Sequence, residues 1–340
     1  MTLRRPLTIR AVTTSEEFKG LAREWDALLS TIPGHSLFLT WEWLYYWAMH
    51  YVGDGQLRIL LACDEDERLV GIAPLYLRRS QEHTVIAVRE LRWLGSEDAC
   101  SSYLDLIVQE SHKPAFLQSL YHYLFGDLRN EWDLLTLSAV PAESSTFDLW
   151  NALVDEAGKV GEVVTTGCCP VIRLPDDLLT YRAGLGRNRR YTLQRKTRYL
   201  QEAGHMQCTR ATAPAEVEAA FKSFITLHER RWRSHPGGGV FANERTRQFH
   251  WDIVRVLSER GRVSIDLLLL DGRPIAGVYG LLYQGVYYFY LPGFDPDIMP
   301  KASPGRLLLH QVIEQAIGDG AQIVDLLQGA QPYKLEWSTG

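Results

Sequence analysis

The chain has 340 residues, of which 46% are hydrophobic and 23% are charged, and its net charge at pH 7 is -5. This length exceeds that of one typical domain and suits two domains, each able to bury its own core. The acidic balance argues against a general nucleic-acid-binding protein, which usually needs a strongly basic domain, but leaves room for a local basic groove.

Cysteine usage and the N-terminal segment together favour a cytoplasmic protein. The cysteines are odd in number and form no CxxC pair, which suits a reducing compartment (Cys63, Cys100, Cys168, Cys169, Cys208). The segment MTLRRPLTIRAVTT has no signal-peptide core, and no run of about 18 apolar residues predicts a membrane span. The histidines are dispersed without HExxH or paired His/Cys spacing, so we predict no metal site.

The first half alternates between strand and helix patterns. Phe18, Leu21, Trp25 and Leu28 recur at helical spacing, and Thr40 is a predicted N-cap. The predicted strands are 7–13, 57–63, 69–77, 85–94, 104–108 and 132–138, and the predicted helices are 16–30, 41–51, 114–125 and 144–157. This order indicates a mixed α/β layer.

Glycine, cysteine and proline interrupt the pattern at 161–175, which predicts two domains, 1–165 and 166–340. The second half shows the same kinds of pattern. Its predicted helices are 181–203, 215–232, 243–260 and 304–317, and its predicted strands are 263–270, 274–282, 286–291 and 322–327.

The two halves share a strand–turn–strand stretch. RILLACDEDERLVGIAPLYL parallels VSIDLLLLDGRPIAGVYGLLY, with Val70-Gly71-Ile72 matching Ala276-Gly277-Val278, and Asp271-Gly272 is a hairpin signal. Two unrelated hairpins are the alternative. The matching order of elements downstream favours a duplicated α/β fold with mixed sheets.

A possible anion site follows the strand that ends at Leu291. Ser303 is a predicted N-cap, Pro304 a first helical residue, and Gly305 allows close approach to the backbone. The free first-turn N–H groups and the helix dipole would stabilise a diphosphate there, with Arg306 adding a charged contact. The alternative is an ordinary capped helix, because neither a P-loop nor a dinucleotide GxGxxG occurs.

Three stretches carry a family resemblance: SLFLTWEW at 36–43, SSYLDL at 101–106 and DLLQGAQPYK at 325–334. With the order of strands and helices, they resemble the CelD/BcsL-type GNAT-like proteins, which are similar in architecture to the FemABX peptidyltransferases. The resemblance implies two tandem GNAT-like domains. It also implies an acyl-CoA-dependent N- or O-acyltransferase acting directly on a sugar, an amino compound or a cell-envelope or exopolysaccharide precursor.

The resemblance implies where acyl-CoA would bind. The pantetheine arm would follow Tyr288, Tyr290 and Leu291, and the pyrophosphate would sit at Ser303, Pro304, Gly305 and Arg306. The first half has the acidic stretch 96–100 at the matching place, so we expect no cofactor there. Two departures stand against the family pattern: Ala302–Arg306 replaces the usual phosphate loop, and little chain follows Tyr333-Lys334 to form the last strands.

Acyl transfer needs a base, oxyanion stabilisation and a proton for the leaving thiolate. The catalytic candidates are Asp325 as base or orienter, Tyr333 as thiolate partner, Lys334 as an anion contact, and His310. Structural roles are the alternatives for each of them. No GxSxG elbow or nucleophilic cysteine context occurs.

The predicted acceptor-binding residues are Glu229, Arg230, Trp232, Gln328 and Arg190. The first three precede the glycine-rich loop 234–239, which is either a mobile lid or a plain surface connection.

The predicted helix 181–203 carries a run of cations, namely Arg182, Arg187, Arg189, Arg190, Arg195, Lys196 and Arg198. Like charges at helical spacing repel each other. A solvated face is one reading; the other is an anionic partner such as a nucleotide-sugar, an acyl-carrier protein or tRNA. Two further hypotheses follow: an aminoacyl-tRNA donor, as in the FemABX proteins, or a catalytically inert scaffold.

Overall fold

The computed structural model describes residues 7–53, 55–80, 87–96 and 100–339. The chain divides into two compact units, Met1–Thr166 and Gly167–Gly340. Residues 85–86 of one predicted strand, and 97–99 of the acidic stretch, lie outside the described residues.

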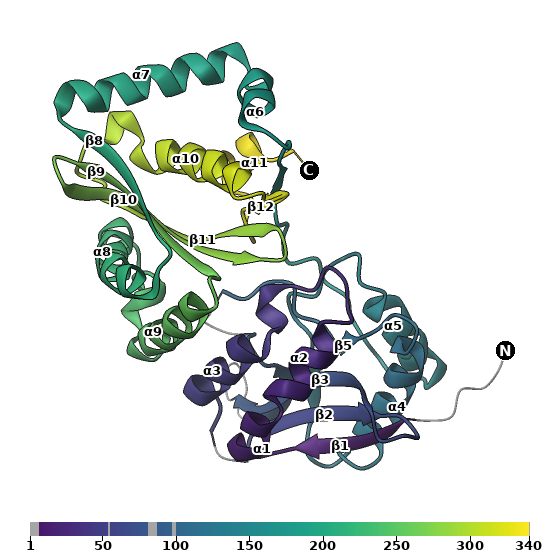
Figure 1. Cartoon of the computed structure of the whole chain (residues 1–340). Helices are drawn as coiled ribbons and strands as arrows, with labels where there is room; N and C mark the ends of the chain where they lie inside the picture. Colours follow the sequence, from purple (N-terminus) through teal and green to yellow (C-terminus); the bar gives the residue numbers. More distant parts are fainter. Residues whose placement is uncertain (1–6, 54, 81–86, 97–99, 340) are drawn as a thin grey trace. The chain divides into compact units, whose positions relative to one another are not determined.

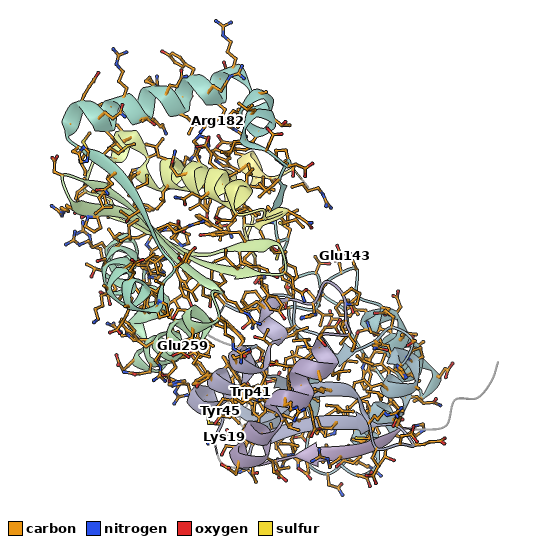
Figure 2. All side chains as sticks on the ribbon, in the orientation of Figure 1. Lys19, Trp41, Tyr45, Glu143, Arg182 and Glu259 are labelled. Carbon is orange, nitrogen blue, oxygen red and sulfur yellow. The ribbon has the colours of Figure 1, made fainter. Side chains whose placement is uncertain are left out.

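The first unit is a sheet with helices on it, with strand order β1-β2-β3-β4-β6 and β5 paired to β3. On α3, Trp41 and Tyr45 stack at 4.4 Å (Figure 2). The strands are β1 Thr8–Val12, β2 Leu57–Cys63, β3 Leu69–Ser80, β4 Val88–Trp93, β5 Ile107–Val108 and β6 Leu134–Thr136; the helices are α1 Ser15–Gly20, α2 Ala22–Leu29, α3 Trp41–Tyr51, α4 Lys113–Phe125 and α5 Thr146–Glu156.

The second unit is a sheet of order β7-β12-β11-β10-β9-β8. Helices α8 and α9 cover one face, while α10 lies on the other with α6 and α7 beyond it (Figure 1). The strands are β7 Val171–Arg173, β8 Met206–Ala211, β9 Val263–Leu270, β10 Arg273–Tyr283, β11 Val286–Phe294 and β12 Ile323–Asp325; the helices are α6 Leu178–Gly184, α7 Arg187–Ala203, α8 Pro214–Trp232, α9 Glu244–Glu259, α10 Pro304–Gly318 and α11 Pro332–Trp337.

The two sheets repeat one strand plan. In the first sheet, neighbouring strands are antiparallel along β1, β2, β3 and β4. In the second sheet, the same holds along β8, β9, β10 and β11. In each unit the next pair is parallel, β4 with β6 and β11 with β12. The predicted α/β fold with mixed sheets and a repeated plan is therefore confirmed.

Several predicted elements differ from the structure. The predicted helix 16–30 breaks at Leu21 into α1 and α2. The basic helix 181–203 breaks into α6 and α7, because Leu185 turns extended to enter the core and Gly186 precedes α7. Thr40 forms no side-chain cap, since its hydroxyl donates to the Leu37 carbonyl at 2.7 Å.

Several predicted strands are shorter in the structure, among them 132–138, which forms a ladder only over Leu134–Thr136, and some elements were not predicted. The expected strand 322–327 keeps ladder pairing only over Ile323–Asp325, and 104–108 only over Ile107–Val108. β7, β8 and α11 carry too few alternating apolar residues to be read from the sequence. β7 pairs antiparallel with β12, so the strand beyond β12 comes from the start of the second unit.

A buried polar network ties three strands of the second sheet together, β8, β9 and β11. Asp266 on β9 accepts from Arg210 Nε at 2.7 Å, from the Tyr287 hydroxyl at 2.9 Å and from Ser264 at 3.0 Å. Tyr287 reaches it across Gly280 on β10, where an added Cβ would lie 2.0 Å from the phenol oxygen. Each buried donor and acceptor in such a network is costly to leave unpaired.

We expect Gly280→Ala to destabilise the second unit by roughly 1–3 kcal/mol, because its methyl group displaces Tyr287 from Asp266. Urea unfolding measures this change. Gly184→Ala, at a site with nothing within 4 Å, is the matched control. Equal stability of the two variants would contradict the role of Gly280.

Candidate acyl-transfer site

Strand β11 parts from β12 in the second unit. The two strands are hydrogen-bonded in parallel only where Val286–Tyr288 of β11 pair with Ile323–Asp325 of β12. In contrast, β11 stays paired with β10 as far as Phe294. The β11 edge at 289–294 therefore has no ladder partner on the β12 side. An opened parallel pair of this kind offers backbone groups to an extended ligand.

A turn after β12 causes the parting. Leu327 has a φ of +57°, and its N–H donates to Asp325 Oδ1 at 2.7 Å. The ammonium of Lys334, from α11, donates to the carbonyls of Leu327 at 3.1 Å and Gln328 at 2.7 Å. Asp325 and Lys334, both buried, thus hold the strand end away from β11.

Helix α8 supports the free part of β11 from the other face. At Gly293 an added Cβ would lie 2.7 Å from the backbone nitrogen of His228, so the helix and strand are in close contact. Arg231 Nη1 donates to the Pro292 carbonyl at 2.8 Å. Its guanidinium also lies 5.3 Å from the ring of Phe294 and 5.3 Å from that of Trp232.

The head of α10 differs from the predicted N-cap. Ser303 has a φ of +53° and makes no cap; its hydroxyl instead accepts a hydrogen bond from Lys196 Nζ of α7 at 2.7 Å. The N–H groups of Arg306 and Leu307 donate to the Ser303 carbonyl at 2.9 and 3.3 Å. Pro304 has no N–H, so Gly305 carries the one first-turn N–H with no partner among the described residues.

A cavity of about 490 Å³ adjoins this helix head. Burial, together with the charges of Arg306 and Arg195, lowers the pKa of Lys196, so an anion nearby would be stabilising. Arg306 is exposed and pairs with Glu336 at 3.0 Å. The lining comes from α7, α10 and α11 and the residue before α7 (Gly186, Asn188, Arg189, Thr192, Leu193, Lys196, Arg306, Leu307, Glu336, Trp337).

The structure brings some predicted site residues together and separates others. Ser303, Pro304, Gly305 and Arg306 lie together at the head of α10, and Asp325 and Lys334 share one turn. Tyr333 lies close enough to Arg231 for their charges to interact, and burial raises its pKa.

His310 occupies a different environment from these residues. Its Nδ1 is 3.2 Å from the Tyr181 hydroxyl, its Nε2 is 3.7 Å from Glu314, and its ring stands 6.0 Å from that of Trp337. Burial lowers its pKa. These contacts with α6 and α11 describe a histidine held in the packing of α10.

The remaining predicted residues have structural partners. Arg190 donates to the Arg182 and Ala183 carbonyls at the end of α6 at 3.4 and 3.3 Å, and Glu229 pairs with Arg247 at 2.8 Å. Arg230 pairs with the buried Asp295. The side chains of Tyr288 and Tyr290 are buried, as is that of Leu291, and Gln328 is exposed beside Gly167.

Sequence reasoning missed His228 and did not separate Arg231 or Lys196 from their charged neighbours. Their importance comes from contacts across the fold. Gly239 and Gly293 flanking His228, and Lys196 reaching Ser303, involve residues far apart in the chain. A single sequence carries no signal for such pairs.

Most of the second unit matches a known protein family. Residues 187–335 match a family model described as an acetyltransferase (GNAT) domain. This segment includes the parted strands and the helix head. The second unit therefore contains a GNAT-type acetyltransferase domain, which confirms the predicted enzyme class, an acyltransferase.

Solved structures share the fold at low sequence identity. FemX is 12% identical over 96% of this chain and 89% of its own, with a TM-score of 0.59. A conserved protein of unknown function from Bacteroides thetaiotaomicron is 10% identical over 98% and 97%, with a TM-score of 0.59. L-PGS from Bacillus licheniformis is 12% identical over 90% and 75%, with a TM-score of 0.53. No curated protein matches the sequence.

Two further findings concern the described residues only. No helix among them is long and apolar enough to cross a membrane. Within the same residues, no group of three or more His, Cys, Asp or Glu side chains is placed to hold a metal ion.

His228 makes the second unit sensitive to acid. Burial, and then the charge of Arg231, lowers its pKa to about 3 from 6.5. Between these two pKa values, His228 binds a proton in the unfolded chain but not in the folded chain. Its contribution to the free energy of unfolding is therefore fully present above about pH 6.5 and is lost as the pH decreases toward 3.

We expect His228→Phe to reduce the acid slope of the unfolding free energy by up to about 1.4 kcal/mol per pH unit in this window. Urea unfolding at a series of pH values measures it. The exposed His235, replaced by Phe, is the control and should leave the slope unchanged. An unaltered slope in His228→Phe would exclude His228 as its source.

Proposed function

We propose that the second unit binds acyl-CoA and transfers its acyl group directly to an amine or hydroxyl of a sugar, an amino compound or a cell-envelope precursor. The diphosphate sits at the head of α10, and the pantetheine arm follows the free edge of β11. The observation that carries the proposal is the combination of a parted strand pair and a helix head that offers an N–H and two cations.

Gly305 supports the diphosphate site. An added Cβ would meet only Phe294 Cδ1, at an ordinary 3.6 Å, so packing within the chain does not require glycine. Glycine in a helix costs roughly 0.5–1 kcal/mol relative to alanine. Close approach of a ligand to the Gly305 N–H would explain why that cost is tolerated.

The cations beside Gly305 fit the phosphate groups of CoA. Lys196 and Arg306 approach the head from α7 and α10, and the adjoining cavity of about 490 Å³ would take the nucleotide end. The flat ring of Trp337 lines this cavity, with Arg189 4.6 Å from its centre. Aromatic and guanidinium planes are suitable surfaces for a nucleobase.

The transfer step needs a proton donor for the leaving thiolate. The acceptor nitrogen or oxygen bonds to the thioester carbonyl carbon, the C–S bond breaks, and the acceptor proton reaches sulfur in the net reaction. Tyr333 from α11 keeps its phenol proton because burial raises its pKa. We therefore assign Tyr333 as the proton donor, and Asp325 and Lys334 as positioning residues of the turn.

Gly305→Ala should weaken acetyl-CoA binding by about tenfold or more, because the methyl group holds the diphosphate away from the N–H. The same change should raise stability by roughly 0.4–1 kcal/mol. Isothermal calorimetry and urea unfolding test the two effects. A loss of affinity without loss of stability separates ligand contact from misfolding.

Gly318→Ala is the matched control for this prediction. Gly318 ends the same helix and has nothing within 4 Å of an added Cβ. Its substitution should leave acetyl-CoA affinity unchanged. Wild-type protein that binds no acyl-CoA, or equal affinities in the two variants, would refute the proposed cofactor site.

A second candidate donor is aminoacyl-tRNA, supported by the outer side of α7. Figure 1 shows α7 on the far side of α10 from the sheet. Tyr191 and Tyr199 are exposed by 62% and 41%. Exposed arginines lie before, between and close to these tyrosines along the same helix (Arg187, Arg190, Arg195, Arg198). Cations that alternate with aromatic rings suit a nucleic-acid strand. The fold likeness to FemX agrees with this donor.

If tRNA binds this face, replacing Arg187, Arg195 and Arg198 by Gln should weaken binding at least tenfold, because the variant no longer neutralises the phosphates that these cations bind. The salt dependence of log K should become shallower by about 0.7–0.9 for each phosphate left without its cation. A gel-shift titration at several salt concentrations measures both. Absence of tRNA binding at low salt would eliminate this candidate.

A further inference from the structure

The last turn of α8 carries several charged side chains, and nearly all are paired. Arg230 pairs with the buried Asp295, Arg233 with Asp297 at 2.6 Å, and Glu229 with Arg247 at 2.8 Å. Arg231 differs from its neighbours. Across the described part of the chain, no carboxylate lies within 4.0 Å of its guanidinium.

Arg231 is nevertheless half-buried. Burial lowers its pKa, and the phenol of Tyr333, which burial keeps neutral, lies close enough to interact with it. One of its N–H groups donates to the Pro292 carbonyl at 2.8 Å. A guanidinium has five N–H donors, so most of them are available to a ligand. A desolvated cation without a counter-charge is unfavourable unless an anion joins it.

Two polar atoms close to Arg231 also lack partners. Trp232 Nε1 and His228 Nδ1 are buried and hydrogen-bonded to nothing among the described residues. His228 is 1% exposed, and its ring stands 6.1 Å from that of Trp232. An indole N–H donates only, so it complements an anion and not another cation. Among the described residues, the neighbourhood of Arg231 thus holds two buried polar atoms without partners and no carboxylate within 4.0 Å of the guanidinium.

The position of Arg231 links this group to the transfer site. Its guanidinium binds the carbonyl of Pro292, on the stretch of β11 that has parted from β12. Tyr333, at the start of α11, lies close enough to interact with its charge. An anion on Arg231 would therefore lie next to the free edge along which the thioester is proposed to run.

We propose that Arg231 binds a carboxylate of the acyl acceptor, so that the acceptor is an acidic amine or alcohol whose carboxylate lies close to its nucleophile. This inference rests on the proposed acyltransferase function and names its substrate class. A carboxylate is favoured over a phosphate because the site offers one full positive charge between two aromatic rings. A planar monoanion matches the guanidinium fork and those flat walls.

The transfer chemistry agrees with an acceptor held in this way. The acceptor amine or hydroxyl attacks the thioester carbon, the C–S bond breaks, Tyr333 gives its phenol proton to sulfur, and the proton lost by the acceptor restores the phenol. The carboxylate stays on Arg231 throughout and takes no part in bond making. Its role is to fix the distance between nucleophile and carbonyl, which is the dominant contribution of positioning to such reactions.

The test uses a small product-like probe, N-acetylglycinate, and its uncharged counterpart N-acetylglycinamide, at constant ionic strength. Ligand-observed NMR titration of the wild-type chain should show binding of the carboxylate and at least about tenfold weaker binding of the amide. Arg231→Gln should bind N-acetylglycinate at least about tenfold more weakly, since it keeps a donor for Pro292 but loses the charge and the fork. The affinity of Arg231→Lys for N-acetylglycinate should lie between those of the wild type and Arg231→Gln.

Arg233→Gln is the matched control, because it removes the same charge from the same helix end at an exposed, paired position. It should bind N-acetylglycinate as the wild-type chain does. Equal binding by wild type and Arg231→Gln, stronger binding of inorganic phosphate than of N-acetylglycinate, or no binding of N-acetylglycinate by the wild type would each overturn the proposal.

Titration with acetyl-CoA tests the proposed cofactor site separately from the proposed carboxylate site at Arg231. Arg233→Gln should retain wild-type affinity for acetyl-CoA. In Arg231→Gln, which keeps a donor for the Pro292 carbonyl, a loss of acetyl-CoA affinity larger than the loss of N-acetylglycinate affinity would make Arg231 a cofactor contact and overturn the acceptor role. Wild-type chain that binds N-acetylglycinate but no acetyl-CoA would instead refute the cofactor proposal while the carboxylate site stands.

Discussion

The parting of β11 from β12 is the constraint on which the proposed site depends. A parallel pair would normally continue its ladder, because each unpaired backbone group loses a hydrogen bond. Here the ladder ends after Tyr288 and Asp325. The β12 side is held by Asp325 and Lys334, which satisfy the backbone of the turn at Leu327. On the β11 side, Arg231 satisfies Pro292. The opening is therefore a stable feature of the fold.

The same constraint explains why the chemistry-bearing residues come from distant parts of the chain. α8 supplies Arg231 beneath the free strand, α11 supplies Tyr333 and Lys334, and α7 supplies Lys196 at the head of α10. α8 packs on the sheet, whereas α7 packs on α10. The polar ends of these elements then meet where the strands separate, which is where extended ligands bind in mixed sheets.

The helix head shows how a local prediction can be partly right. Proline at the first helical position, glycine next and arginine after it do form an exposed helix start. Ser303 does not cap it, because its left-handed backbone directs the hydroxyl to Lys196. An anion there would depend more on the two cations and on Gly305 than on a full set of free N–H groups.

The sequence alone determined the class of fold, the repeated plan and most element positions. Those depend on local periodicity and on turn residues such as Asp271-Gly272, which short windows of sequence carry. Only the tertiary structure decided that Lys196 meets Ser303, that Arg231 binds the Pro292 carbonyl of the parted strand, and that His310 is held by Tyr181 and Glu314. These contacts join residues up to 129 positions apart. Their geometry is set by how helices and strands pack, and neither composition nor spacing specifies that packing.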